Sequence, residues 1–277
     1  MSPVRNRFDS TFERLRAGGE LGLFPYLTVG FPDPATCSRL LEAIAAAGAD
    51  GLELGVPFSD PLADGVTLQR ASARALEYGA GVGDALDLVD QLRQRHQIPV
   101  SLMSYVNPLL GYGVDRFCRD GAAAGLDAVI VPDLPLEESI VFQRACVDHG
   151  LHYVYMVAPT SGPERLVAVG ERAAGFVYCV ALVGTTGARA GLSAELPEFL
   201  ANARRAIRAP LVAGFGISTS AHVAELARLG RLDGAIVASA LADLIERTEP
   251  AEVEAAVSAY VRELKKATRS QATLSER

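Results

Sequence analysis

The sequence has no tryptophan and only two lysines, Lys265 and Lys266, which stand near its carboxyl end. It also has no basic excess: the net charge is −7 and the pI is near 5.2, which argues against a nucleic-acid partner because such partners bind basic stripes. No apolar run approaches the roughly 18 residues that a membrane-spanning helix needs. Residues 1–18 carry four arginines but no long apolar stretch, so no signal peptide is expected.

Cysteine is scarce and scattered, at Cys37, Cys118, Cys146 and Cys179. No two of these positions have the spacing of a metal site or a redox motif, and nothing indicates export, so no disulfide framework is expected. Cys179 lies inside an apolar run and is interpreted as a small core residue. We therefore expect a cytoplasmic protein.

Short apolar runs alternate with amphipathic stretches along the whole chain. Each run has the length of a strand, and the stretches between them repeat apolar residues at helical spacing. The runs are Leu23–Val29, Gly51–Val56, Val100–Ser104, Ala128–Val131, Tyr153–Val157, Phe176–Val180, Leu211–Ala213 and Gly234–Val237. Strands that alternate with helices form parallel sheets, so the fold class is α/β.

Eight such strands without a linker or a shift in composition fit one closed (β/α)8 barrel, the TIM barrel, over residues 1–268, and residues 269–277 are expected to be a disordered polar tail. A doubly wound open sheet is the structural alternative. It is disfavoured because no G-x-G-x-x-G motif follows the first strand. Two segments exceed the barrel pattern: residues 1–18 predict a helix across the bottom, and Thr67–Tyr78 predict an extra helix after the second strand.

The second strand carries an unusual acid. Alternation along this strand places Leu52 and Leu54 on the face toward the helices and Glu53 on the face toward the barrel interior. Gly51 and Gly55 flank Glu53 and are expected to leave a hollow beside it. Partial desolvation raises the pKa of a carboxyl group and suits it to act as a general acid. The alternative is a structural glutamate paired with a buried arginine.

A second acid, Asp64, lies in the loop after this strand. Loop aspartates commonly form turns or cap helices, and Asp64-Gly65 before Thr67 fits that interpretation. The loop must nevertheless fold back over the mouth of the barrel, where the strand that carries Glu53 ends. The two carboxyl groups are therefore predicted to meet.

Leu52-Glu53-Leu54-Gly55-Val56-Pro57-Phe58-Ser59-Asp60-Pro61-Leu62-Ala63-Asp64-Gly65 closely resembles the signature of the tryptophan synthase alpha subunit family. The resemblance extends over roughly residues 8–266. Weaker motifs continue it in register with the predicted strands: Pro25-Tyr26-Leu27-Thr28-Val29-Gly30, Tyr105-Val106-Asn107-Pro108, Pro132-Asp133-Leu134-Pro135, Ala158-Pro159-Thr160 and Gly214-Phe215-Gly216-Ile217-Ser218.

The resemblance implies a lyase that cleaves indole-3-glycerol phosphate to indole and glyceraldehyde 3-phosphate by a retro-aldol route. By resemblance, Glu53 protonates C3 of the indole ring, Asp64 holds the indole N–H, and Tyr178 is a further catalytic tyrosine. The residues themselves disfavour two other aldolase mechanisms. The two lysines lie in the final helix, away from any Schiff-base position. The four histidines are expected at helix ends or within helices, none at a strand's carboxyl end, so no metal site is predicted.

Backbone N–H groups at helix starts bind phosphate without lysine or arginine, and in these barrels they usually follow strands seven and eight. The resemblance places Gly216, Ala238 and Ser239 there, with Gly187 from the loop after strand six. The family commonly has glycine at the position of Ala238, so its methyl group is expected to crowd the phosphate unless the backbone there has an ordinary conformation.

Segment 183–191 resembles a lid, in which Thr186 contacts Asp64 on closure. Val66 replaces a proline that is usual in the family signature, so the loop is expected to be less rigid. An apolar pocket for the indole ring is predicted from Tyr26, Met103, Ile130 and Met156.

The resemblance also implies an αββα heterotetramer with a beta subunit that binds pyridoxal phosphate, and no cofactor in this chain. Residues that match family positions near that interface are Pro57, Phe58, Asp60, Pro61 and Asn107. Three alternatives stay open: a stand-alone lyase that releases free indole, a non-catalytic barrel that activates its partner, and a phosphosugar isomerase, which has no use for the long signature.

Overall fold

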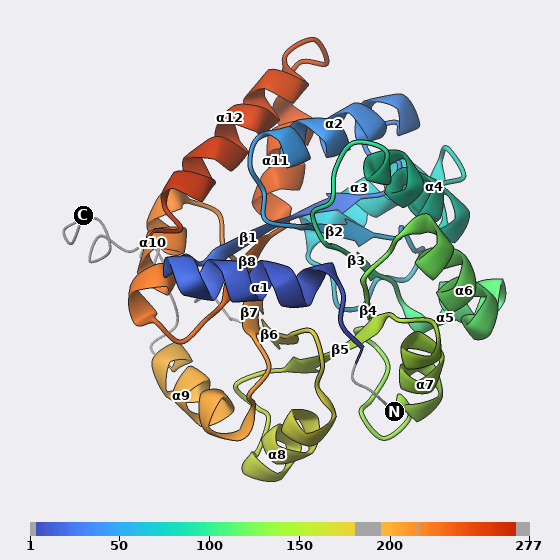
Figure 1. Cartoon of the computed structure of the whole chain (residues 1–277). Helices are drawn as coiled ribbons and strands as arrows, with labels where there is room; N and C mark the ends of the chain where they lie inside the picture. Colours follow the sequence, from blue (N-terminus) through green and yellow to red (C-terminus); the bar gives the residue numbers. More distant parts are fainter. Residues whose placement is uncertain (1–3, 181–194, 215, 270–277) are drawn as a thin grey trace.

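The computed structural model describes residues 4–180, 195–214 and 216–269. Within these ranges, parallel strands β1 to β8 pair in chain order and close into a barrel through β1 and β8 (Figure 1). The strands are β1 (Gly22–Thr28), β2 (Leu52–Gly55), β3 (Val100–Met103), β4 (Ala128–Ile130), β5 (His152–Val157), β6 (Val177–Val180), β7 (Leu211–Gly214) and β8 (Gly234–Val237). Closure confirms the predicted (β/α)8 barrel and excludes the open sheet.

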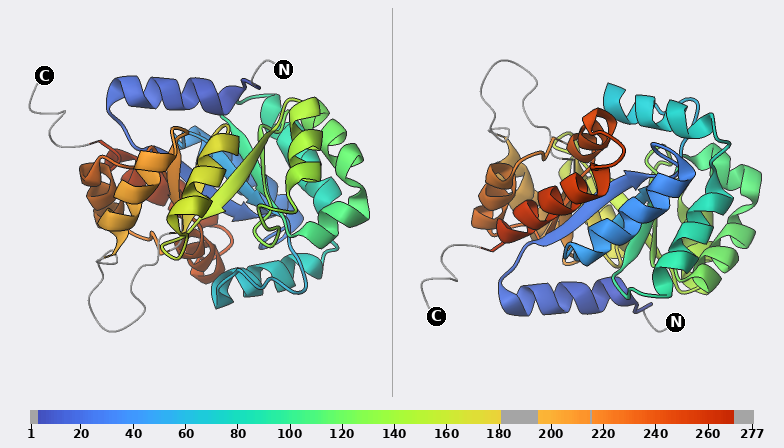
Figure 2. Two further views of the ribbon diagram at one scale, coloured as in Figure 1. Left: turned by 90° about the horizontal axis from the view of Figure 1, so that it is seen from below. Right: turned by 90° about the horizontal axis from the view of Figure 1, so that it is seen from above.

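The helices surround this barrel (Figure 1). They are α1 (Arg7–Gly18), α2 (Pro34–Ala46), α3 (Val66–Leu76), α4 (Val82–Arg93), α5 (Val106–Tyr112), α6 (Val114–Ala124), α7 (Ile140–Asp148), α8 (Pro163–Arg172), α9 (Leu196–Ala206), α10 (Ser220–Leu229), α11 (Ser239–Arg247) and α12 (Val253–Lys266). Both predicted extra helices are present, as α1 and α3, and they lie at opposite ends of the barrel (Figure 2). None of the helices in the described ranges is long and apolar enough to cross a membrane.

Strand alternation divides the core into two clusters. Leu52 and Leu54 point outward and pack with the helices in the outer cluster, which also buries Cys179 as predicted. The inner cluster fills the barrel, and α1 extends it from below with Phe8 and Phe12. The ring of Phe8 lies 5.0 Å from that of Phe176, between ring centroids. An apolar plug therefore closes the lower end of the barrel.

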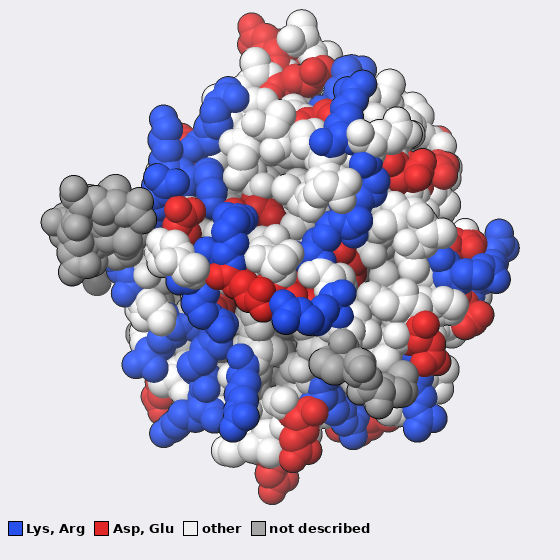
Figure 3. Space-filling model, in the orientation of Figure 1, with Lys and Arg blue, Asp and Glu red and all other residues white. Residues whose placement is uncertain are grey.

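Helix α1 begins at Arg7, later than predicted, because Asn6 caps it. The Asn6 side chain accepts the Phe8 N–H, and the Asn6 N–H donates to Asp9 in a capping box. Arginines of the same helix form ion pairs with aspartates of the barrel, and charged side chains of both signs lie on this face of the molecule (Figure 3). An apolar face toward the plug and a charged face toward the barrel rim together hold α1 across the floor.

Three aspartates at the starts of strands form what we call the floor acids: Asp50, Asp127 and Asp233. Each accepts a backbone N–H from the strand before it in the barrel and pairs with an arginine of α1. The three sets of partners are Leu23 N–H and Arg14 for Asp50, Val100 N–H and Arg7 for Asp127, and Leu211 N–H and Arg16 for Asp233. Charge-assisted hydrogen bonds of this kind are stronger than neutral ones. The floor acids therefore fasten α1 to the barrel.

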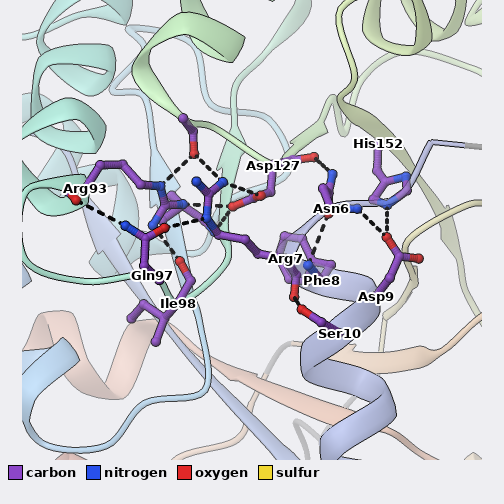
Figure 4. Close-up of polar contacts among 12 residues, drawn as sticks. Asn6, Arg7, Phe8, Asp9, Ser10, Arg93, Gln97, Ile98, Asp127 and His152 are labelled. Carbon is purple, nitrogen blue, oxygen red and sulfur yellow. Dashed lines mark hydrogen bonds and ion pairs between the residues drawn. The ribbon is translucent and has the colours of Figure 1, made fainter.

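Asp127 also pairs with an arginine outside α1. Its carboxylate lies 2.8 Å from the guanidinium group of Arg93 in α4, and the two side chains are 1% and 10% exposed (Figure 4). Beside it, His152 Nε2 lies 2.9 Å from the Asp9 carboxylate. His152 begins β5, so the prediction that all four histidines lie at or within helices is wrong for this one. The strand was predicted to begin one residue later, because the apolar run starts at Tyr153. The prediction that no histidine lies at the carboxyl end of a strand holds for His152, since it stands at the amino end of β5.

Candidate active site

A cavity of about 250 Å³ opens at the carboxyl ends of the strands, opposite α1. It brings together the two acids that the sequence singled out, Glu53 and Asp64, with the predicted residues Tyr26, Met103, Tyr178, Gly216, Ala238 and Ser239. Its lining also contains Gly65, Ile217 and Ser218 of the quoted motifs, Ala240 next to Ser239, and two residues that sequence reasoning did not select, Leu68 and Asp243. No lysine or arginine lines the described part of this cavity.

Glu53 projects from β2 into the barrel and is 1% exposed. Its Oε2 atom is buried and has no hydrogen-bond partner among the described residues. Burial, with the nearby charge of Asp64 as a second cause, raises the pKa of Glu53 from its usual 4.5 to about 8. The alternative of a structural glutamate paired with a buried arginine is therefore excluded for the described part of the chain. At neutral pH, Glu53 is a protonated acid.

The expectation that Gly51 and Gly55 leave an empty hollow beside Glu53 is wrong. A Cβ atom at Gly55 would lie 1.7 Å from the hydroxyl of Tyr26, and one at Gly51 would lie 2.8 Å from the ring of Phe24. Aromatic rings from β1 fill the space because side chains of neighbouring strands share each layer of a barrel interior. The glycines thus admit two rings, and the cavity lies above them.

Asp64 is held by Tyr105, a residue of a quoted motif to which sequence reasoning gave no role. The Tyr105 hydroxyl accepts the N–H of Ala63 at 2.8 Å. Burial raises the pKa of Asp64, and a hydrogen bond from Tyr105 partly opposes that rise. The Phe58 ring packs on Tyr105 with 5.4 Å between centroids. The loop after β2 and Tyr105, the N-cap residue of α5, thereby fix the second acid over the cavity.

Tyr178 lies within β6 and lines the cavity. Its ring passes over Gly214, where an added Cβ atom would lie 2.0 Å from the hydroxyl. Burial, followed by the charge of Glu53, raises the pKa of Tyr178 well above its ordinary value. Tyr178 therefore stays neutral and borders the ring end of the cavity.

The opposite end of the cavity has the geometry of an anion site. Helix α11 begins at Ser239, and the first N–H groups of a helix have no partner within it. Gly216 has φ of +77°, a conformation that favours glycine. Ala238 has φ of −115° and ψ of −80°. The alanine that departs from the family pattern is therefore not at a position whose φ favours glycine.

Two residues predicted for the ring pocket lie outside this cavity. Ile130 is fully buried in the inner cluster, and Met156 lines a separate cavity of about 440 Å³ beside β4 and β5. The reason is that the cavity opens over the loops after β2, β7 and β8, whereas the Tyr178 ring occupies the side toward β5. Tyr26 and Met103 line the cavity as predicted.

The loop after β2 presents a mixed surface next to the cavity. Of the positions predicted for a partner interface, Asp60 and Asn107 are exposed and Phe58 and Pro61 are half-buried. Pro57 is buried and is not available to a partner, because the chain there still runs through the top of the barrel wall. Leu62 and Val66 are 91% and 71% exposed, so large apolar side chains stand in solvent beside this loop.

Thr186 and Gly187, with the predicted lid at 183–191, lie outside the described residues. The same holds for residues 270–277. Among the residues that are described, no group of three or more histidine, cysteine, aspartate or glutamate side chains is placed to hold a metal ion. The carboxyl groups that line the described part of the cavity are Glu53 and Asp64 near the inner tyrosines and Asp243 near the start of α11.

Comparisons with known proteins agree with this geometry. The family model described as Tryptophan synthase alpha chain matches residues 12–269. A tryptophan synthase alpha chain of Chloroflexus aggregans is 50% identical over 264 residues, 95% of this chain and 98% of that one. One from Geobacter sulfurreducens is 43% identical over 95% and 98% of the two chains. The solved tryptophan synthase subunit alpha of Legionella pneumophila has a TM-score of 0.86 at 35% identity and covers 95% and 98% of the two chains.

Proposed function

Since the chain belongs to the tryptophan synthase alpha chain family and is a lyase that cleaves indole-3-glycerol phosphate, we propose that Glu53 and Asp64 carry out the cleavage in the cavity at the barrel mouth. The observation that carries this assignment is a buried acid without a cation, poised above the inner aromatic layer. The cleavage belongs to the biosynthesis of tryptophan.

The first step is protonation of the indole ring. Glu53 holds its proton at neutral pH because its pKa is raised to about 8. It delivers this proton to C3, and the ring nitrogen takes the positive charge as an indolenine. The Glu53 carboxylate then removes the proton of the hydroxyl on the adjoining carbon. The carbon–carbon bond breaks, its electrons restore the neutral indole, the aldehyde forms, and Glu53 ends protonated as it began.

Asp64 faces the same cavity and supplies the negative charge that the indolenine nitrogen requires. Its carboxylate accepts the ring N–H and stabilises the cation as it develops, in a site where water is largely excluded and electrostatic interactions are strong. Tyr105 positions Asp64 through its hydroxyl. Tyr178 and Tyr26 border the ring as neutral phenols, since burial raises the pKa of both. Thr186 is proposed to reach Asp64 when the lid closes.

The phosphate group of the substrate fits the start of α11. The N–H groups of Ser239 and Ala240 and the hydroxyl of Ser239 are proposed as its donors, with Gly216 and Gly187 allowing close approach of the backbone. No cationic side chain is needed, which agrees with the described lining. Asp243 also lines this end, but Arg70 of α3 pairs with it at 3.4 Å and offsets its charge toward the phosphate.

We propose a tryptophan synthase beta subunit as the partner, in an αββα assembly in the cytoplasm. The exposed Leu62 and Val66 beside the loop after β2 support a protein contact there, because exposed apolar patches mark interaction sites. Phe58 joins this surface to Asp64 through Tyr105. Pyridoxal phosphate belongs to the beta subunit, and no cofactor is proposed for this chain.

The test is indole release from indole-3-glycerol phosphate by wild type, Glu53→Gln and Asp64→Asn. We expect both variants to stay folded and to lose activity by about 100-fold or more, the usual size of a general acid–base contribution. A near-normal rate for Glu53→Gln rejects the proposed acid. Indole release by the isolated chain excludes a non-catalytic activator. Faster release on addition of a beta subunit separates the complexed form from a stand-alone lyase.

A further inference from the structure

A second and larger cavity opens at the floor of the barrel, on the face opposite the candidate active site. It measures about 530 Å³ and lies between the carboxyl end of α1, helices α9 and α10, and the start of β8. Four arginines line it: Arg16, Arg204, Arg208 and Arg231. Figure 3 shows lysine and arginine side chains gathered over α9 and beside the carboxyl end of α1. The mechanism proposed above uses none of these residues.

The two acids in the lining are already matched by cations. Asp233 pairs with Arg204 and, at 3.3 Å, with Arg16. Glu20 pairs with Lys265 at 3.4 Å and with Arg269 at 3.0 Å. Neither acid is therefore available to neutralise further charge in the cavity.

Of the four arginines that line the cavity, Arg208 and Arg231 are left without an acidic partner among the described residues. No carboxylate of the described residues lies within ion-pair distance of either guanidinium group, and both side chains are exposed at the cavity. The backbone carbonyl of Arg231 accepts two bonds from Arg204, which ties the segment that carries Arg231 to α9. A chain of net charge −7 thus holds two unmatched arginines over one concave surface.

The remaining walls are apolar. Leu15 and Leu21 come from the end of α1 and the segment before β1, and Leu232 comes from the segment before β8. The volume lies within the range of roughly 300–1,000 Å³ that is typical of small-molecule sites. Two guanidinium groups suit a dianion, because arginine binds phosphate and carboxylate oxygens in a bidentate manner. The apolar walls suit a hydrocarbon group attached to that anion.

We propose that this floor cavity binds a small phosphate monoester that carries an apolar group. Arg208 and Arg231 hold the phosphate, and the leucine walls contact the apolar part. The site is separate from the proposed phosphate site, because α11 begins at the carboxyl end of β8 and the floor cavity lies at the start of β8. This proposal does not depend on the reaction at the mouth.

The test is isothermal titration calorimetry with phenyl phosphate at a pH where the phosphate is dianionic. The variant is Arg208→Gln/Arg231→Gln. Its matched control is Arg205→Gln/Arg228→Gln, which removes the same charge from the same region without touching the cavity lining. We expect the variant to bind one equivalent fewer than wild type, and the control to bind as many as wild type. Indole release by both variants stays unchanged.

The comparison of wild type, variant and control still tests the floor cavity if the proposed phosphate site at the barrel mouth does not bind phenyl phosphate. In that case wild type and control bind one equivalent and the variant binds none. Equal stoichiometry and affinity in the variant and wild type overturn the proposal. Tighter binding of phthalate than of phenyl phosphate to wild type, lost in the same variant, overturns the assignment of a phosphate and replaces it with a dicarboxylate.

Discussion

The two ends of the barrel bury acidic side chains to a similar degree and use them in opposite ways. At the floor, Asp50 and Asp127 are 4% and 0% exposed, and each receives a backbone N–H and at least one cation. At the mouth, Glu53 is 1% exposed and receives no cation from the described residues, and its Oε2 has no partner.

This difference separates stability from chemistry within one fold. A buried carboxylate that is paired with cations and backbone N–H groups fastens elements together through those contacts. An unpaired one is costly to ionise, so it stays protonated and can act as an acid. The (β/α)8 architecture favours the division, because the carboxyl ends of the strands hold the active site and the amino ends hold stabilising contacts.

The largest loss of stability is expected at the floor. Asp127→Asn leaves the guanidinium of Arg93, whose side chain is 10% exposed, without its carboxylate. Breaking a buried ion pair by removing one partner costs about 3–5 kcal/mol, so the free energy of unfolding should fall by about 3 kcal/mol. Urea denaturation measures it. Asp115→Asn, at a side chain that is 79% exposed, serves as the control and should change little. A near-zero effect of Asp127→Asn would contradict the fastening role.

Glu53→Gln should raise the free energy of unfolding, whereas Asp127→Asn lowers it, and the size of the increase should depend on pH. The folded pKa of Glu53 is raised to about 8 from 4.5, so its contribution to stability is complete below about pH 4.5 and is lost as pH rises through about 8. The glutamine variant has no such loss. Its free energy of unfolding should exceed that of wild type by an amount that grows over this window, at up to about 1.4 kcal/mol per pH unit. Parallel pH profiles for the two proteins would exclude a buried neutral acid.

Much of this division was visible in the sequence. Regular alternation of strand and helix predicted the barrel, and alternation within β2 predicted that Glu53 faces inward. The floor acids were overlooked, although each directly precedes a predicted apolar run or stands within two residues of its strand. That position at the amino end of a strand is a signal that could have revealed them.

Other contacts could not be inferred because they join segments far apart in the chain. Ala63 and Tyr105, which together orient Asp64, are 42 positions apart and meet only when loops of two strands converge. Ile130 and Met156 were placed in the ring pocket by strand position alone. The position of the cavity depends on how the Tyr26 and Tyr178 rings fill the barrel interior. The pattern of residues along one strand does not predict how rings from other strands pack.

A matched pair of glycine substitutions compares the layers of the barrel interior. Gly55→Ala places a Cβ atom against the Tyr26 hydroxyl below the active-site cavity, and Gly51→Ala places one against Phe24 and the carbonyl of Pro99 nearer the floor. Overpacking costs about 1–3 kcal/mol, so both variants should be less stable. Only Gly55→Ala should also raise the KM for indole-3-glycerol phosphate, because Tyr26 must move into the cavity. Steady-state kinetics at a temperature where both are folded checks this, and equal KM values would contradict it.

The smallest effect is expected at Tyr105. Tyr105→Phe keeps the ring that packs on Phe58 but removes the hydroxyl that holds Ala63 and Asp64. Loss of one such hydrogen bond, about 1 kcal/mol, predicts roughly a fivefold fall in kcat/KM. The acidic limb of the pH–rate profile should move to higher pH, since the hydrogen bond lowers the pKa of Asp64. An unchanged profile would show that Tyr105 only fills space.

The protonation state of Glu53 tests the account most directly. Infrared difference spectroscopy of wild type against Glu53→Gln, taken across a pH titration, reports the protonated carboxyl group of this one residue. The account predicts that its band persists at neutral pH and disappears with a midpoint near 8. A carboxylate signal already complete at pH 6 would contradict it, since the barrel mouth would then hold an ordinary ionised acid.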